Sequence, residues 1–225
     1  MAGKTLSFPL LQNGDRLSRV EFERRYQAMP QLKKAELIEG VVHTPSPLRF
    51  RQHAQSQAHL LLWLGFYAQA VSGLEVGDNP TVRLDDSNEP QPDAVLMMVG
   101  GQAHFSANDY IEGSPELVAE IAASTVSHDL REKKQVYQRN GIQEYLVWRV
   151  LDNAIDWFCL NEESYQPLQP DHQNVIKSHC FPCLWLNVSA LLSGDIPAVL
   201  ATLQRGLKSR LAILGNRVIE DSFPL

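Results

Sequence analysis

The sequence has little cysteine and no long apolar run. Only three of its 225 residues are cysteines, too few for the disulfide framework of a small secreted domain. The longest apolar run, residues 60–67, is far shorter than the stretch of about 20 apolar residues that spans a bilayer. The N-terminus also lacks the apolar segment of a secretory signal peptide. These scarcities lead us to expect a soluble, cytoplasmic protein.

Positive charge is also in short supply. The formal net charge is -6, whereas proteins that hold nucleic acid through their overall charge are usually basic. Any contact with nucleic acid must therefore be local and assisted by a metal ion.

The composition, 44% hydrophobic and 20% charged, is that of a globular chain with one sizeable core. No internal repeat, low-complexity tract or obvious linker divides the sequence. We predict an N-terminal tail at residues 1–16, one domain at residues 17–195 and a C-terminal helical extension at residues 196–225.

The spacing of apolar residues predicts a mixture of helices and strands. Helices are predicted over residues 18–29, with Ser18 as N-cap, and over residues 51–71, 127–140 and 197–213. Extended segments are predicted over residues 35–43, 74–84, 93–99, 116–122, 143–150, 155–160 and 181–186, with a polar loop over residues 100–114. This pattern predicts an α/β (α+β) fold in which helices cover a sheet.

Cys180 and Cys183 have the CxxC spacing that occurs in zinc sites. A structural zinc ion needs about four ligands, and the nearby candidates are only His172, His179 and Cys159. Ordinary thiols are therefore the favoured interpretation, with a zinc site as the alternative.

Two carboxylates occupy unusual places in the predicted strands. Asp93 follows Pro92 at the start of an apolar strand, although aspartate is also a common turn residue. Glu120 lies inside the apolar segment 116–122, whose other face is wholly apolar. In a central strand this carboxylate would need a cation or a proton, because an unpaired buried charge is costly. A salt bridge or a place at the sheet edge is the alternative.

A lysine follows on the next predicted helix. The helical neighbours of Lys133 are Asp129, Leu130, Val136 and Tyr137, which are mostly apolar or aromatic. This environment favours the inner rim of the helix for Lys133, whereas Lys134 has more polar neighbours. A solvated lysine is the alternative for either residue.

Two carboxylates on adjacent strands with a lysine from the next helix suffice for metal-assisted hydrolysis. Mg2+ prefers oxygen ligands and retains several waters. A bound cation lowers the pKa of its water and offsets charge on a phosphate. A nearby lysine can orient the water or neutralise the transition state. Asp93, Glu120 and Lys133 are therefore the candidate catalytic residues.

A longer series of residues resembles a known family, the Uma-type restriction endonucleases of the PD-(D/E)XK nuclease superfamily. The matching elements are Pro92-Asp93, Pro115 to Glu120, Ser124-Thr125, Asp129-Leu130, Lys133, Tyr137, Gly141, Glu144-Tyr145, Glu36 to Gly40, His53, Ser178 and Phe181-Pro182. The resemblance covers about residues 17 to 195 and implies a restriction-endonuclease-like mixed β-sheet flanked by α-helices.

The resemblance also implies roles. Asp93 and Glu120 would bind Mg2+, for which Mn2+ can substitute, and Lys133 would be the catalytic lysine. Three further residues would line the site: Glu36, His53 and Tyr137. The substrate implied is DNA, and the superfamily makes a homodimer plausible.

Two features depart from the superfamily pattern. The lysine expected two residues after Glu120 is replaced by Ala122, and in the Uma-type family the lysine is thought to come from the following helix, where Lys133 lies. The family's usual S-P-S-T loop reads Ala123-Ser-Thr125, without the proline. A catalytically inactive nuclease fold that binds nucleic acid or protein is the alternative function.

Overall fold

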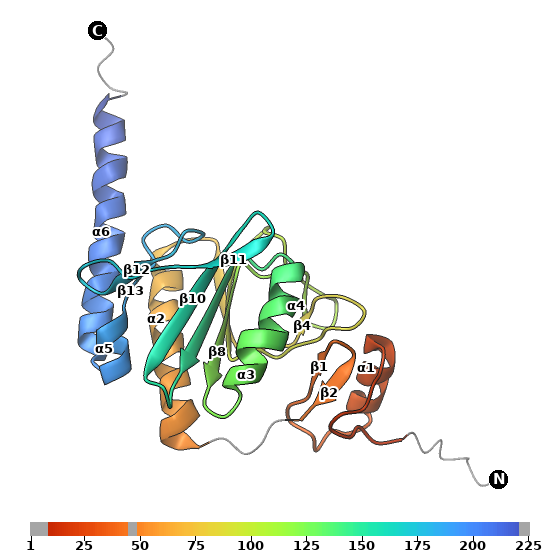
Figure 1. Cartoon of the computed structure of the whole chain (residues 1–225). Helices are drawn as coiled ribbons and strands as arrows, with labels where there is room; N and C mark the ends of the chain where they lie inside the picture. The colour runs from red at the N-terminus through yellow and green to blue at the C-terminus, as the bar shows by residue number, and fades with distance from the viewer. Residues whose placement is uncertain (1–8, 45–48, 221–225) are drawn as a thin grey trace, which may run out of the picture.

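A mixed six-stranded sheet forms the centre of the fold (Figure 1). The computed structural model describes residues 9–44 and 49–220, with side chains as far as residue 209. The sheet consists of β3 (Leu74–Asp78), β5 (Ala94–Met98), β8 (Leu117–Ala122), β9 (Glu144–Arg149), β10 (Ala154–Asn161) and β11 (Ser164–Pro167). Their order is β11-β10-β9-β8-β5-β3, with β8 and β9 parallel and the other neighbours antiparallel. The predicted mixed sheet with flanking helices is confirmed.

The central strand β8 is buried along its whole length. Leu117 and Ile121 on one face join the larger hydrophobic core. Val118 and Ala122 on the other face pack in a second cluster with Tyr137. Strand alternation therefore works as predicted, and it sends the side chain at position 120 into the second face.

The second face of the sheet is covered by the crossover between β8 and β9 (Figure 1). Parallel neighbours require such a connection. It consists of α3 (Val126–His128), a π-helical turn called η2 (Asp129–Lys133) and α4 (Lys134–Arg139). The helix predicted over residues 127–140 thus exists, but its first part is wound differently. It ends before Gly141, whose φ angle is +76°.

The first face is covered by α2 (Gln55–Ala70), which follows a π-helical turn called η1 (Phe50–Ala54). The long α6 (Ile196–Glu220) packs beside α2, and α5 (Val188–Ser193) packs against α6 (Figure 1). This core includes Leu60, Trp63, Leu64, Tyr67, Trp157, Leu191 and Leu203.

The N-terminal unit begins with α1 (Arg19–Gln27). The Ser18 side chain accepts a hydrogen bond from the Glu21 amide, as predicted for its N-cap. Residues 9–16 pack against the segment that holds α1 and the following strands. Leu11 is buried there, and the backbone groups of Gly14 and Asp15 form hydrogen bonds with Val42 in β2. The division of the chain into a tail, a domain and an extension stays a prediction.

A hairpin replaces the single extended segment predicted over residues 35–43. Its strands are β1 (Glu36–Ile38) and β2 (Val41–His43). The chain reverses because Glu39 and Gly40 adopt φ angles of +52° and +70°, the combination that a tight two-residue hairpin turn requires.

Besides the β1-β2 hairpin, short strands form two further small sheets. One contains β4 (Val82–Arg83), β7 (Ile111–Glu112) and β6 (His104–Phe105), so the polar loop predicted over residues 100–114 carries two of its strands. The extended segment predicted over residues 74–84 divides between this sheet and the large one. The other pair is β12 (Val175–Lys177) and β13 (Trp185–Asn187).

The strand predicted over residues 181–186 starts only at Trp185, because a buried carboxylate folds the preceding residues into turns. Glu144 is fully buried and accepts bonds from Ser178 Oγ at 2.8 Å and from the amides of His179 and Cys180 at 2.6 and 2.9 Å. The Trp157 indole also donates to it at 3.1 Å.

Among the helices described, none is long and apolar enough to span a membrane.

Candidate active site

Asp93 and Glu120 lie opposite each other on adjacent strands. The antiparallel register pairs Ala94 with Ala119, and continuing it by one position brings Asp93 opposite Glu120. Asp93 Oδ2 accepts a bond from the Ile121 amide at 2.7 Å, so this carboxylate is tied to β8. Both acidic residues are only 3% exposed. The sequence prediction that they meet on neighbouring strands agrees with this geometry.

Three further side chains contact Asp93. His53 Nε2 lies 3.1 Å from its Oδ2, and Lys34 Nζ lies 3.3 Å from its Oδ1. Gln57 donates to its backbone carbonyl at 3.2 Å. His53 Nδ1 is buried and has no hydrogen-bond partner among the described residues.

Glu120 shares its Oε1 between two donors. Lys133 Nζ lies 2.9 Å from it, and the Tyr137 hydroxyl donates to it at 2.8 Å. The same ammonium lies 2.9 Å from Glu36 Oε1 and 4.0 Å from Asp129 Oδ1. Lys133 is 4% exposed, so the inner-rim position predicted for it is correct.

The cluster contains more negative than positive charge. Four buried carboxylates face two lysines: Glu36, Asp93, Glu120 and Asp129, with Lys34 and Lys133. Full ionisation would leave two excess negative charges. Burial raises the pKa of Glu120 to about 8 despite the nearby Lys133 ammonium, and Asp93 and Asp129 add to the rise. Burial also raises the pKa of Asp129. Protonation of Glu120 or a bound divalent cation would offset the excess negative charge of the cluster.

Other groups in the cluster favour their charged forms. Burial would raise the pKa of Glu36, but Lys133 and Lys34 hold it below its ordinary value. Burial of Asp93 is likewise outweighed by the His53 hydrogen bond and by Lys34, which lower its pKa. Burial would lower the pKa of Lys133, but Glu120 and Glu36 raise it well above its ordinary value.

Both π-helical turns carry residues of the cluster. His53 lies in η1, while Asp129 and Lys133 lie at the two ends of η2. All three side chains are buried. Such turns interrupt regular helices at some cost and are frequent at functional sites. Their coincidence with the cluster supports a functional interpretation.

The structure brings together all six residues singled out from the sequence: Asp93, Glu120, Lys133, Glu36, His53 and Tyr137. Sequence reasoning assigned no place in the site to Asp129 or Lys34. Asp129 had a usable signal, its spacing of four residues from Lys133 on one helix. Lys34 had none, because only the docking of the hairpin brings it near Asp93.

Residues 20–189 match the Uma2 family, which is described as "Putative restriction endonuclease". The chain belongs to the Uma2 family. Family membership gives it a nuclease-like function. A comparison with curated proteins gave no significant match.

Among solved structures, the Uma2 chain is similar to "a putative nuclease belonging to DUF820 from Anabaena variabilis". The two are 14% identical, with a TM-score of 0.58, and the likeness covers 76% of this chain and 96% of the other. At this identity the similarity establishes the fold, a mixed sheet flanked by helices.

The CxxC pair of this Uma2 chain lies outside the acidic cluster. Cys180 and Cys183 are free and partly buried. Within the described residues neither belongs to a group of three or more potential metal ligands. Burial raises the pKa of Cys180 to about 12, which disfavours the thiolate that zinc binds. The interpretation as ordinary thiols agrees with these findings.

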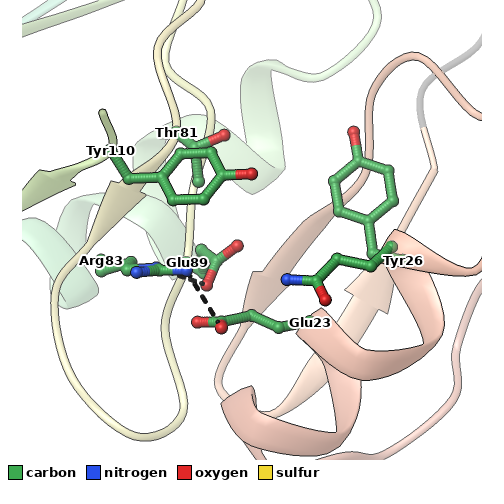
Figure 2. Close-up of a pocket in the computed structure, with 7 residues that line it drawn as sticks. Glu23, Tyr26, Thr81, Arg83, Glu89 and Tyr110 are labelled. Carbon is green, nitrogen blue, oxygen red and sulfur yellow. Dashed lines mark ion pairs between the residues drawn. The ribbon is translucent and has the colours of Figure 1, made fainter. Parts of the chain in front are cut away.

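A second ionic cluster joins α1 to the small sheet of the Uma2 chain (Figure 2). Arg83 lies 3.0 Å from Glu23 and 3.1 Å from Glu112, and its guanidinium stacks on Tyr110. Burial and a hydrogen bond with Glu23 raise the pKa of Glu89 to about 8. The cavity between these side chains is only about 20 Å³, enough for about one water molecule. A cavity of this size has no room for a substrate, so the role of this cluster is to hold α1 against the three-stranded sheet.

Proposed function

We propose that this protein is a Mg2+-dependent endonuclease that hydrolyses DNA phosphodiester bonds. The observation that carries the proposal is the excess of buried carboxylates around Lys133 and Lys34, within a fold that belongs to a nuclease family. Buried like charges are costly, so a bound cation would stabilise such an arrangement.

The donor set fits a hard divalent cation. Asp93 and Glu120 would be its ligands, and Glu36, which shares the Lys133 ammonium with Glu120, would be a third carboxylate of the site. Carboxylate oxygens are what Mg2+ prefers, and Mn2+ accepts the same donors. When bound, the cation would activate a water and offset negative charge on the scissile phosphate.

The other residues of the cluster have distinct tasks. Lys133 would place its ammonium beside the reacting phosphate, where it stabilises charge that develops in the transition state. His53 and the Ile121 amide orient Asp93 through bonds of 3.1 and 2.7 Å. The Tyr137 hydroxyl orients Glu120 through a hydrogen bond of 2.8 Å.

The test is a cleavage assay on supercoiled plasmid, single-stranded DNA and RNA, with Mg2+, Mn2+ or EDTA. We expect metal-dependent nicking of DNA that Asp93→Asn abolishes and Lys133→Ala reduces by about 100-fold or more. Lys134→Ala is the matched control, since its ammonium stacks on Phe158 and should be dispensable.

Cleavage that survives in Asp93→Asn would point to a contaminating nuclease and would refute the assignment. Metal binding that depends on Asp93, without cleavage of any nucleic acid, would instead favour the inactive binding module. The same assay measures whether the protein cleaves DNA in preference to RNA. The homodimer stays a prediction, which sedimentation of the purified protein would test.

A further inference from the structure

A second group of potential metal ligands lies outside the acidic cluster. It comprises His43 at the end of β2, His128 at the end of α3 and Glu132 in η2. One donor atom from each residue lies within 4.8 Å of the other two. The two imidazole rings face each other with centroids 4.5 Å apart, and His128 Nδ1 lies 2.6 Å from Glu132 Oε2.

One buried ring nitrogen in this group, His128 Nε2, lacks a hydrogen-bond partner among the described residues. A carboxylate only accepts hydrogen bonds, so the contact with Glu132 requires the proton on His128 Nδ1. The lone pair of the neutral ring is then on Nε2, which is buried and has no hydrogen-bond partner among the described residues. Buried polar atoms are rarely left without a partner. A cation that accepted this lone pair would satisfy the atom.

The group is also accessible from solvent. The Glu132 side chain is 59% exposed and His43 is partly buried. Both residues line a surface cavity of about 370 Å³ that is also bordered by Arg16 and Glu39. An ion and its waters could therefore enter without opening the core.

We propose that His43, His128 and Glu132 form a second metal site that binds a divalent transition metal ion of the Zn2+ class. Two imidazoles and one carboxylate match the preference of Zn2+, whereas Mg2+ prefers an all-oxygen set. Ligand bonds of about 2.1 Å at a tetrahedral angle separate donor atoms by roughly 3.4 Å. Binding of the ion by His128 Nε2 requires the Glu132 carboxylate to leave Nδ1 and turn toward the other edge of the ring, which its 59% exposed side chain permits.

The site would join two parts of the fold that carry the acidic cluster. His43 belongs to the hairpin that contains Glu36, while His128 immediately precedes η2 and Glu132 lies within η2, next to Lys133. A bound ion would therefore tether the hairpin to the π-helical turn and stabilise both. This inference does not depend on the proposed nuclease activity.

The experiment uses full-length, tag-free protein stripped of metal. Co2+ is added first, because its visible absorption bands report histidine ligation, and Zn2+ affinity is then measured by competition with a chromophoric chelator. The variants are His43→Ala, His128→Ala and Glu132→Gln, with His104→Ala as an exposed histidine control. Asp93→Asn removes a ligand of the acidic cluster, and a Cys180→Ser/Cys183→Ser variant removes the CxxC thiols.

We expect wild-type protein to bind Zn2+ with a rise in melting temperature. His43→Ala and His128→Ala should weaken binding more than about tenfold, while the His104, Asp93 and cysteine variants should retain it. Glu132→Gln keeps the shape of an exposed side chain, so weaker binding there supports the site even if a histidine variant misfolds. Equal Zn2+ affinity in wild type and in all three site variants would overturn the proposal. So would loss of binding in the cysteine variant alone, or no binding to wild type.

Discussion

Replacing Lys133 with methionine removes the ammonium that lies between Glu36 and Glu120. Both contacts are 2.9 Å long and all three side chains are buried. Methionine preserves most of the volume, so the main loss is electrostatic. Removal of one partner from a buried ion pair costs about 3–5 kcal/mol. For a protein of this size the melting temperature should fall by roughly 6–20 °C.

The loss of stability in Lys133→Met should depend on pH. Without Lys133, the remaining carboxylates are tolerable only when protonated, and their protonation is easier at about pH 6 than at about pH 9. The penalty should therefore grow across that interval. Thermal melts of metal-free protein, monitored by circular dichroism, measure it directly.

Lys134→Met is the matched control for this prediction. Its Nζ stacks on the Phe158 ring, 3.4 Å from the centroid, so its loss should cost no more than about 1 kcal/mol. In a double-mutant cycle, Lys133→Met and Glu36→Gln should couple by about 1 kcal/mol or more. If Lys133→Met melts like Lys134→Met at every pH, the buried ion pair does not exist in solution and the electrostatic account of the site is wrong.

Three further predictions concern stability. The pKa of Glu120 in the folded protein, about 8, lies above its ordinary value of 4.5, so the stability it contributes is complete below about pH 4.5 and is lost as pH rises through about 8. Glu120→Gln should flatten that decline in metal-free melts, and an equally steep decline in the variant would contradict the shift. Glu144→Ala should cost about 3 kcal/mol or more in urea unfolding, because the buried Trp157 indole and three part-buried donors lose their acceptor. A loss below about 1 kcal/mol would show that these donors find other acceptors. Gly206→Ala should lower the melting temperature, because the new Cβ would lie 2.5 Å from the backbone oxygen of Cys183. The control is Gly65→Ala, whose Cβ would lie in open space and should stabilise α2 by about 1 kcal/mol.

Much of the site could be predicted because it follows from local rules. Strand alternation placed Glu120 apart from the apolar face of β8, and helical spacing placed Lys133 on the inner rim. These rules hold wherever an element is long and strongly patterned.

The remainder depends on contacts that no local pattern contains. The hairpin turn uses Glu39-Gly40, whereas Asn-Gly or Asp-Gly is the usual signal, so the reversal was not predictable from residue type. The late start of β13 results from Glu144, which lies far away in sequence. The π-helical winding of η1 and η2 also has no signature in the residues that form it.

The cluster joins segments that are distant along the chain. Glu36 and Lys133 are separated by 97 positions, and Lys34 and Asp93 by 59. Contacts of such long range pay a large loop-closure entropy and tend to form late in folding. No fragment that lacks either the hairpin or η2 can assemble the cluster. During refolding, binding of the proposed metal ion should therefore return after secondary structure does, which would make it a reporter of complete folding.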